Sequence, residues 1–121
     1  MLRPMRILLA EDERTVSRLI TQVLAALGHD VTGVQSAAEA IDALGGRQFD
    51  LVLLDLHLVD GDGMRVVDAL QTTPLDKTPV VLMTGEHLQD TDDPRFARVA
   101  GVLSKPFEID DLEQTVRRFS A

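Results

Sequence analysis

The sequence of 121 residues contains no cysteine, and this absence removes two kinds of structure. Without thiols the chain can form neither a disulfide nor a thiolate metal site, and it suits a reducing compartment. Long apolar runs are also missing: no stretch reaches the ~18 apolar residues of a membrane span, and the first apolar run is too short for a secretory signal. We therefore expect a cytoplasmic protein with no membrane insertion.

Positive charge is scarce. Lysine and arginine number 12 against 20 aspartates and glutamates, which gives a net charge of −8 at pH 7. Nucleic-acid surfaces hold phosphates with clustered Lys and Arg, and this chain has no such cluster, so we expect no direct nucleic-acid binding. The length and the 45% of hydrophobic residues suit one core, so we predict a single domain over residues 1–121.

Short apolar runs alternate along the chain with amphipathic segments. The runs predict strands at residues 7–10, 30–34, 51–54, 79–83 and 101–104. Helical spacing and capping signals predict helices at 14–27, 36–44, 64–70 and 108–119. Gly28 should end the first helix, and Ser36 with Glu39 forms a capping box for the second. Residues 87–100 hold three aspartates and a proline, so we expect a short or irregular fourth helix there.

Three of these strands are apolar on both faces, which requires cover on both sides of a sheet. Strands that alternate with helices predict a parallel sheet with helices on each face, so the fold class is α/β, a doubly wound five-stranded parallel sheet. Right-handed crossovers point the strands in one direction, and the residues that follow them share one edge. Open α/β sheets place their ligand sites at that edge.

Polar side chains from four strands fall at this edge: Glu11, Asp12, Asp55, Thr84 and Lys105. Three carboxylates repel each other, by up to about 4 kcal/mol per pair at ~4 Å for an effective dielectric of about 20, so they indicate a bound cation. Oxygen ligands favour Mg²⁺ or Mn²⁺. A lysine and a hydroxyl facing that ion would hold a phosphoryl group. The Asp55 carboxylate is the candidate nucleophile, which would form an acyl phosphate.

Each of these residues also has a plainer interpretation when it is taken alone. Asp12 could be the N-cap of the helix that follows, and Asp55 could be a turn residue at a strand end. Thr84 could be an ordinary β-branched strand residue, and Lys105 a solvated loop lysine. The coincidence of all of them at one edge is what favours a site.

Four short motifs stand in a fixed order: AED at 10–12, LLD at 53–55 with Asp62-Gly63 after it, MTG at 83–85 and SKPF at 104–107. Together they resemble the receiver domain of two-component response regulators, over nearly the whole chain. The resemblance implies a flavodoxin-like (βα)5 fold with strand order 2-1-3-4-5. It also implies a phosphoacceptor in a two-component system or phosphorelay, here a stand-alone regulator.

The resemblance assigns roles to the acidic residues. It implies that Asp55 accepts a phosphoryl group from a phosphohistidine on a histidine kinase or histidine phosphotransferase. Asp12 and Asp55 would bind Mg²⁺ directly, helped by the backbone carbonyl of His57. Glu11 would act largely through water.

The remaining roles implied by the resemblance concern the phosphoryl group. Thr84 would hydrogen-bond one phosphoryl oxygen and Lys105 would pair with another, and the Lys105-Pro106 bond would be cis. The side chains of His57 and Glu86 lie where the family tunes hydrolysis of the acyl phosphate.

Several positions depart from the family pattern, and one of them concerns the switch. Three residues before Lys105 the family usually has an aromatic side chain that turns inward when the phosphoryl-bound threonine moves, and here it is Val102. The usual relay from Thr84 to an aromatic is therefore in question, and so is the output surface formed with the irregular fourth helix.

Three functions remain open at this point. The first is a signalling receiver that catalyses only its own phosphorylation and dephosphorylation and acts on a downstream protein target, with a phosphorylation-dependent dimer as one outcome. The second is a metal-dependent phosphohydrolase of the haloacid-dehalogenase type, although His57 stands where that family has a second acid. The third is a receiver-like interaction module that is not phosphorylated.

Overall fold

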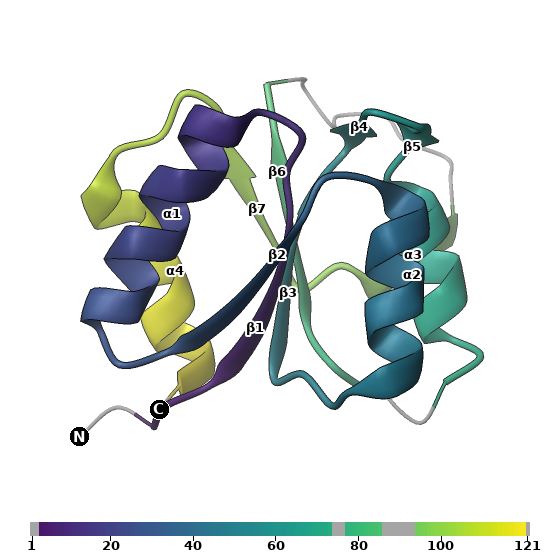
Figure 1. Ribbon diagram of the computed structural model, residues 1–121, viewed down its shortest axis with the longest axis horizontal. Coiled ribbons are helices and arrows are strands. Elements are labelled where there is room, and N and C mark those ends of the chain that lie inside the picture. The colour runs from purple at the N-terminus through teal and green to yellow at the C-terminus, as the bar shows by residue number, and fades with distance from the viewer. Residues whose placement is uncertain (1–2, 74–76, 86–93, 121) are drawn as a thin grey trace.

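A parallel sheet of five strands forms the centre of the structure, a computed structural model that describes residues 3–73, 77–85 and 94–120. The strands are β1 (Arg6–Ala10), β2 (Asp30–Val34), β3 (Leu51–Asp55), β6 (Val80–Thr84) and β7 (Gly101–Ser104). They lie in the order β2-β1-β3-β6-β7, and each neighbouring pair is parallel (Figure 1). Two short strands, β4 (His57–Leu58) and β5 (Gly61–Asp62), form a separate antiparallel hairpin. The predicted order 2-1-3-4-5 is confirmed for the five principal strands.

The central strands are apolar because both of their faces are covered. β3 and β6 are buried at every residue, whereas the edge strand β2 buries only Val34. Successive side chains alternate between two cores. One core receives Ile7, Leu9, Leu51, Leu53, Val81 and Met83 from the strands, and the other receives Leu8, Val52, Leu54, Val80 and Leu82.

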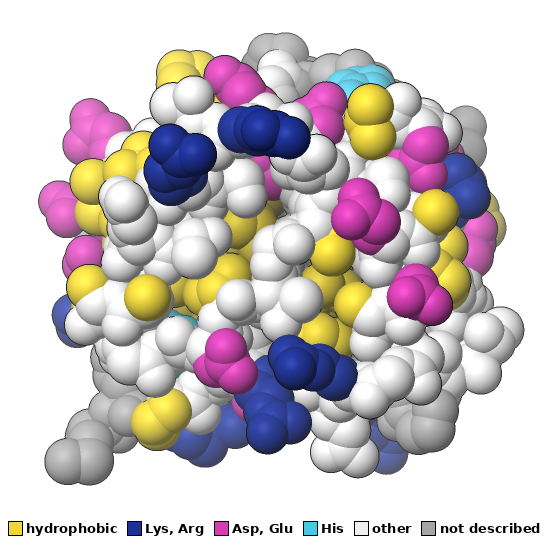
Figure 2. Space-filling view, in the orientation of Figure 1, with side chains coloured by type: hydrophobic (Ala, Val, Ile, Leu, Met, Phe, Trp, Pro, Cys, Tyr) yellow, Lys and Arg dark blue, Asp and Glu magenta, His cyan; other side chains and the backbone are white. Residues whose placement is uncertain are grey.

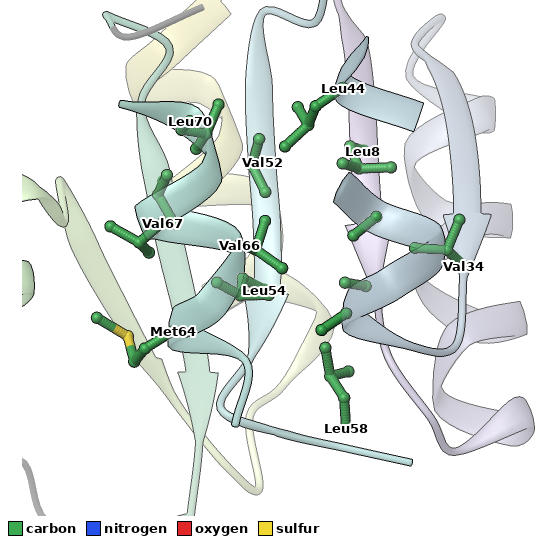
Figure 3. Close-up of a cluster of buried hydrophobic side chains, with 14 of the residues drawn as sticks. Leu8, Val34, Leu44, Val52, Leu54, Leu58, Met64, Val66, Val67 and Leu70 are labelled. Atoms are coloured by element: carbon green, nitrogen blue, oxygen red, sulfur yellow. The ribbon is translucent and has the colours of Figure 1, made fainter. Parts of the chain in front are cut away.

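Helices cover both faces of the sheet (Figure 1). Helices α1 (Arg14–Ala26) and α4 (Ile109–Ser120) lie on one face, and α2 (Ala37–Gly46) and α3 (Met64–Leu70) lie on the other. Figure 3 shows the second core, where the helices and strand β4 contribute Leu44, Leu58, Met64, Val66, Val67 and Leu70. The 3-10 helix η1 (Pro94–Arg98) packs Phe96 against this same core, and Val99 follows it there.

Local signals account for the end of α1 and the start of α2, but not for the end of α2. Gly28 has a φ of 94° just after α1, which is the left-handed conformation that glycine adopts at helix ends. The Ser36 hydroxyl accepts a hydrogen bond from the Glu39 amide at 3.0 Å and opens α2 as predicted. The predicted end of α2 at Leu44 is wrong, because the helix continues through both glycines to Gly46. A glycine in the last turn costs a helix about 1 kcal/mol at most, which packing can offset.

The short fourth helix that the sequence predicts is confirmed by η1, a 3-10 helix of five residues. The rest of that segment, 87–93, lies outside the described residues. Within the part of the chain that the structure describes, no helix combines the length and apolar character needed to cross a membrane. Acidic and basic side chains are interspersed over the face shown in Figure 2.

Candidate functional site

The carboxyl edge of the sheet gathers three acids from two strands. Glu11 and Asp12 follow β1, and Asp55 ends β3, which lies beside β1. One carboxylate oxygen from each of the three lies within 4.8 Å of the others. Glu11 is fully buried, Asp55 is 6% exposed and Asp12 is exposed. The cluster therefore combines two buried acids with one acid that faces solvent.

Lys105 reaches this cluster from β7 at the far edge of the sheet. Its Nζ donates to Glu11 Oε1 and lies 3.2 Å from Asp55 Oδ2. The Lys105 amide donates to the Thr84 carbonyl at 2.8 Å, which ties the ends of β6 and β7 together at the site. The Lys105-Pro106 peptide bond is cis. One ammonium thus bridges carboxylates from two different strands.

The charges at this edge do not balance. The pKa of Glu11 is raised to about 7, first by burial and then by a hydrogen bond with Asp55, while Lys105 acts in the opposite direction. Burial alone would lower the pKa of Lys105, but its hydrogen bond to Glu11 and the two nearby carboxylates raise it instead. A carboxylate that holds its proton near neutral pH beside a lysine lacks sufficient positive charge around it. A cation among the three acids would supply that charge.

The all-oxygen set of Glu11, Asp12 and Asp55 fits a hard divalent cation. Magnesium commonly uses one or two carboxylates and completes its shell with water and phosphate oxygens, so an exposed acid beside two buried ones suits it. The plainer interpretation of Asp12 as an N-cap is wrong, because Glu13 occupies the N-cap position of α1 and makes no capping bond with its side chain.

The loop after Asp55 wraps closely around that residue. The His57 amide donates to Asp55 Oδ1 at 3.1 Å, and the Gly63 amide donates to the Leu56 carbonyl at 2.8 Å. A Cβ at Gly63 would lie 2.2 Å from the Asp55 carbonyl oxygen, so only glycine fits this approach. The backbone of His57 therefore lies at the site, while its side chain is exposed.

Thr84 is the last residue of β6 and is 2% exposed. Its neighbour Met83 pairs in register with Asp55, so Thr84 stands one residue beyond the phosphoacceptor candidate on the adjacent strand. Val102, at the position where an aromatic was expected, lies on β7 and is 48% exposed. Glu86 lies outside the described residues.

Two acids near the site have structural roles that sequence reasoning missed. Asp60 accepts hydrogen bonds from the amides of Ala37 at 2.8 Å and Ala38 at 3.1 Å, and so caps α2. These bonds lower the pKa of Asp60, and Arg65 adds to the effect. Asp62 accepts from the Met64 amide at 2.8 Å and opens α3. No local signal marks the Asp60 cap, because its partners stand 23 and 22 residues earlier in the chain.

Comparison with protein families agrees with this geometry. A family model, the response regulator receiver domain, matches residues 7–117. The chain belongs to this family. Receiver domains are signalling modules rather than members of a catalytic enzyme family, and this one has a phosphoacceptor role in two-component signalling.

Several known proteins resemble this receiver over most of its length. The response regulator receiver protein CpdR of Brucella abortus is 33% identical over 118 residues, which cover 93% of this chain and 94% of CpdR. The transcriptional regulatory protein CrdR of Helicobacter pylori is 31% identical over 94% of this chain. This chain spans only 54% of CrdR, about half of that relative's length.

Solved structures show the same fold. The chemotaxis response regulator CheY4 of Vibrio cholerae superposes with a TM-score of 0.87 at 22% identity, covering 96% of this receiver and 98% of that chain. The receiver domain of the sensor histidine kinase PA1611 from Pseudomonas aeruginosa has a TM-score of 0.85 at 24% identity, covering 96% and 97%. That structure holds a magnesium ion in its active site cleft.

Proposed function

We propose that Asp55 is the residue of this receiver that accepts the phosphoryl group. Its carboxylate oxygen attacks the phosphorus of a phosphohistidine, the phosphorus–nitrogen bond breaks, and the ring nitrogen keeps the electron pair. An acyl phosphate then remains on Asp55. The observation that carries this proposal is the position of Lys105 Nζ, which contacts Glu11 and lies 3.2 Å from Asp55 Oδ2. A buried nucleophile with a cation at its side suits attack on an anionic group.

Lys105 and Thr84 are the proposed groups that hold the transferred phosphoryl. Before transfer the Lys105 ammonium is paired with Glu11 and Asp55. After transfer the same ammonium donates to a phosphoryl oxygen, since the Asp55 carboxylate has become an ester-like acyl group with less charge. The Thr84 hydroxyl donates to a second phosphoryl oxygen. Both interactions pull the ends of β6 and β7 toward the site.

Magnesium, or manganese in its place, is the proposed cofactor. Asp12 and Asp55 would hold it with the backbone carbonyl of His57, and Glu11 would act through water. The bound ion supplies charge neutralisation to the carboxylates and to the phosphoryl oxygens. The clustering of three carboxylate oxygens within 4.8 Å, and the raised pKa of Glu11, support this assignment.

The acyl phosphate also has to be hydrolysed, and we infer that the receiver catalyses both its own phosphorylation and its own dephosphorylation. The side chains of His57 and Glu86 are the proposed groups that tune the hydrolysis rate. The exposed side chain of His57 fits such a role, because it can meet incoming water without disturbing the buried acids.

The proposed phosphodonor is a histidine kinase or histidine phosphotransferase, and the proposed output is a change in the binding of a downstream protein or in dimer formation. An apolar hollow of about 360 Å³ lies beside the site, lined by Val16, Leu19, Pro106 and Phe107 next to Lys105 and Glu13. Leu19 is 45% exposed there. Lys105 belongs to both the hollow and the acid cluster, which supports docking of the phosphohistidine donor at this place.

Labelling with a small phosphodonor tests the proposal. Acetyl phosphate with Mg²⁺ should add the mass of one phosphoryl group to the protein, and Asp55→Asn should take up none. Asp50→Asn is the matched control, since Asp50 accepts from the Arg6 amide at 2.9 Å at the opposite edge of the sheet and should label like wild type. Label that persists in Asp55→Asn would refute the assignment, and steady turnover of phosphomonoesters would indicate the phosphohydrolase instead.

A further inference from the structure

The hairpin β4–β5, residues His57 to Asp62, connects the site to elements on both sides of it. At its start the His57 amide donates to Asp55 Oδ1 at 3.1 Å, and His57 pairs across the hairpin with Asp62. Leu58 is buried in the core beneath α2, where Figure 3 shows it. Asp60 is bonded to the first turn of α2. A displacement of Asp55 is therefore either resisted by the contacts between the hairpin and α2 or transmitted along the hairpin to Asp62.

Arg95 of η1 holds the Asp62 side of the hairpin. Its Nη2 lies 3.4 Å from Asp62 Oδ2, and its Nη1 lies 3.0 Å from Asp68 Oδ2 on α3. The Arg95 side chain is 27% exposed, so water screens it less than a fully exposed arginine. A planar guanidinium can meet two carboxylates with separate nitrogens, which a lysine ammonium does less well. One side chain of η1 thus joins the hairpin to α3.

A hollow beside η1 leaves this helix room to move. A hollow of about 450 Å³ lies between the hairpin and η1, lined in part by Leu56, Leu58, Met64 and Phe96. Phe96 is only partly buried at its margin. At the end of η1, Arg98 donates to the Thr78 carbonyl at 2.6 Å and fixes it near the start of β6. The hairpin end of η1 therefore has room to shift while the other end is held.

We propose that Arg95 is a positioning residue that couples the occupancy of Asp55 to the position of η1 through Asp62. This inference rests on the proposed function, because it needs a phosphoryl group at Asp55. The path runs from Asp55 to His57, across the hairpin to Asp62, and on to Arg95. This path does not need the aromatic side chain of the usual relay, whose position Val102 occupies in this receiver. By linkage, weakening the contact should alter the site as well as η1.

Partly exposed ion pairs are weak, so the expected effects are moderate. Removing Arg95 should raise the rate of acyl phosphate hydrolysis about two- to fivefold, because a loosened hairpin admits water to Asp55 more often. Arg95→Lys keeps the charge and one contact and should fall between Arg95→Gln and wild type. Such graded rescue is not expected if Arg95 merely supports the fold.

Backbone amide shifts on addition of beryllium fluoride and Mg²⁺ provide the direct test. In wild type, Arg95, Phe96 and Val99 should shift, and in Arg95→Gln these shifts should fall by more than half while those at Thr84 and Lys105 persist. Arg65→Gln is the matched control, since Arg65 pairs with Asp60 at 3.6 Å on the α2 side of the hairpin and should leave the η1 shifts as in wild type.

The possible outcomes distinguish a failure of this inference from a failure of the proposed function. Full η1 shifts in Arg95→Gln, or equal losses in Arg65→Gln, overturn the role of Arg95 while acetyl phosphate labelling of Asp55 stands. Wild-type protein that takes no label overturns the proposed function and this inference together. Hydrolysis rates that are identical in wild type, Arg95→Lys and Arg95→Gln also contradict it.

Discussion

Replacement of Gly63 by alanine gives the sharpest test of how the loop packs around Asp55. The added methyl would lie 2.2 Å from the Asp55 carbonyl oxygen and 3.1 Å from that of Leu56. Real Cβ atoms essentially never approach a heavy atom closer than 3.0 Å, so the loop or the start of α3 must move by about 0.8 Å. The clash is with backbone, which cannot rotate away as a flexible side chain would.

Forced displacement in a buried region of this kind costs about 1–3 kcal/mol. Gly63 has an ordinary φ of −63°, so alanine suffers no conformational strain of its own and the cost comes from contact alone. We expect Gly63→Ala to lower the free energy of unfolding by that amount in a urea titration and to shift the thermal midpoint down by several degrees. Labelling of Asp55 by acetyl phosphate should fall as well, because the displaced atom belongs to that residue.

Gly45→Ala is the matched control for this prediction. Gly45 lies in the last turns of α2, and a Cβ there would meet nothing within 4 Å. The same substitution should therefore stabilise the protein by up to about 1 kcal/mol, through better helix propensity. A Gly63→Ala variant as stable as wild type, or a loss of equal size in Gly45→Ala, would refute the steric reasoning.

Three further perturbations have expected outcomes. Burial lowers the pKa of His29 below its usual 6.5. The stability that neutral His29 contributes is therefore complete above about pH 6.5 and is lost as the pH falls below that value. In urea titrations from pH 8 to pH 5, the stability advantage of wild type over His29→Gln should decrease. Asp60→Ala should lower the thermal midpoint at pH 7, because it removes the cap on α2. The lowered pKa of Asp60 means that its contribution to stability is present above pH 3.8 and lost below it, so the difference in thermal midpoint from wild type should become smaller in acid. Mg²⁺ should raise the thermal midpoint in proportion to the logarithm of its concentration, and Asp12→Asn should weaken this response without unfolding the protein; a response unchanged by Asp12→Asn would place the ion elsewhere.

The sheet and the gathering of Asp55 and Lys105 at one edge of it could be predicted because the strand signals are local and strong. Continuous apolar runs such as Leu51–Leu54 specify buried parallel strands, and the direction of such strands brings Asp55 and Lys105 to one edge without knowledge of any side-chain contact. The packing of two helix layers then follows from the alternation of strands and helices.

Two of the missed features depend on pairs of residues that are remote in the chain. Asp62 and Arg95 are 33 residues apart, and Asp60 and Ala37 are 23 apart, so neither contact leaves a pattern in a short window. Aspartate favours both turns and helix caps, so the residue type of Asp60 does not distinguish the two roles. The extension of α2 through Gly46 differs from these, since tertiary packing there overrides a weak local preference.

The contact between Glu11 and Lys105 joins residues 94 positions apart, and it has a consequence for the protein during its synthesis. Strand β3, which carries Asp55, is synthesised before β7, and the lysine that contacts Asp55 follows β7. A nascent chain that does not yet include β7 and Lys105 therefore carries the acids without the lysine and should be inert toward phosphodonors. We therefore expect the receiver to become able to accept a phosphoryl group only when β7 has joined the sheet.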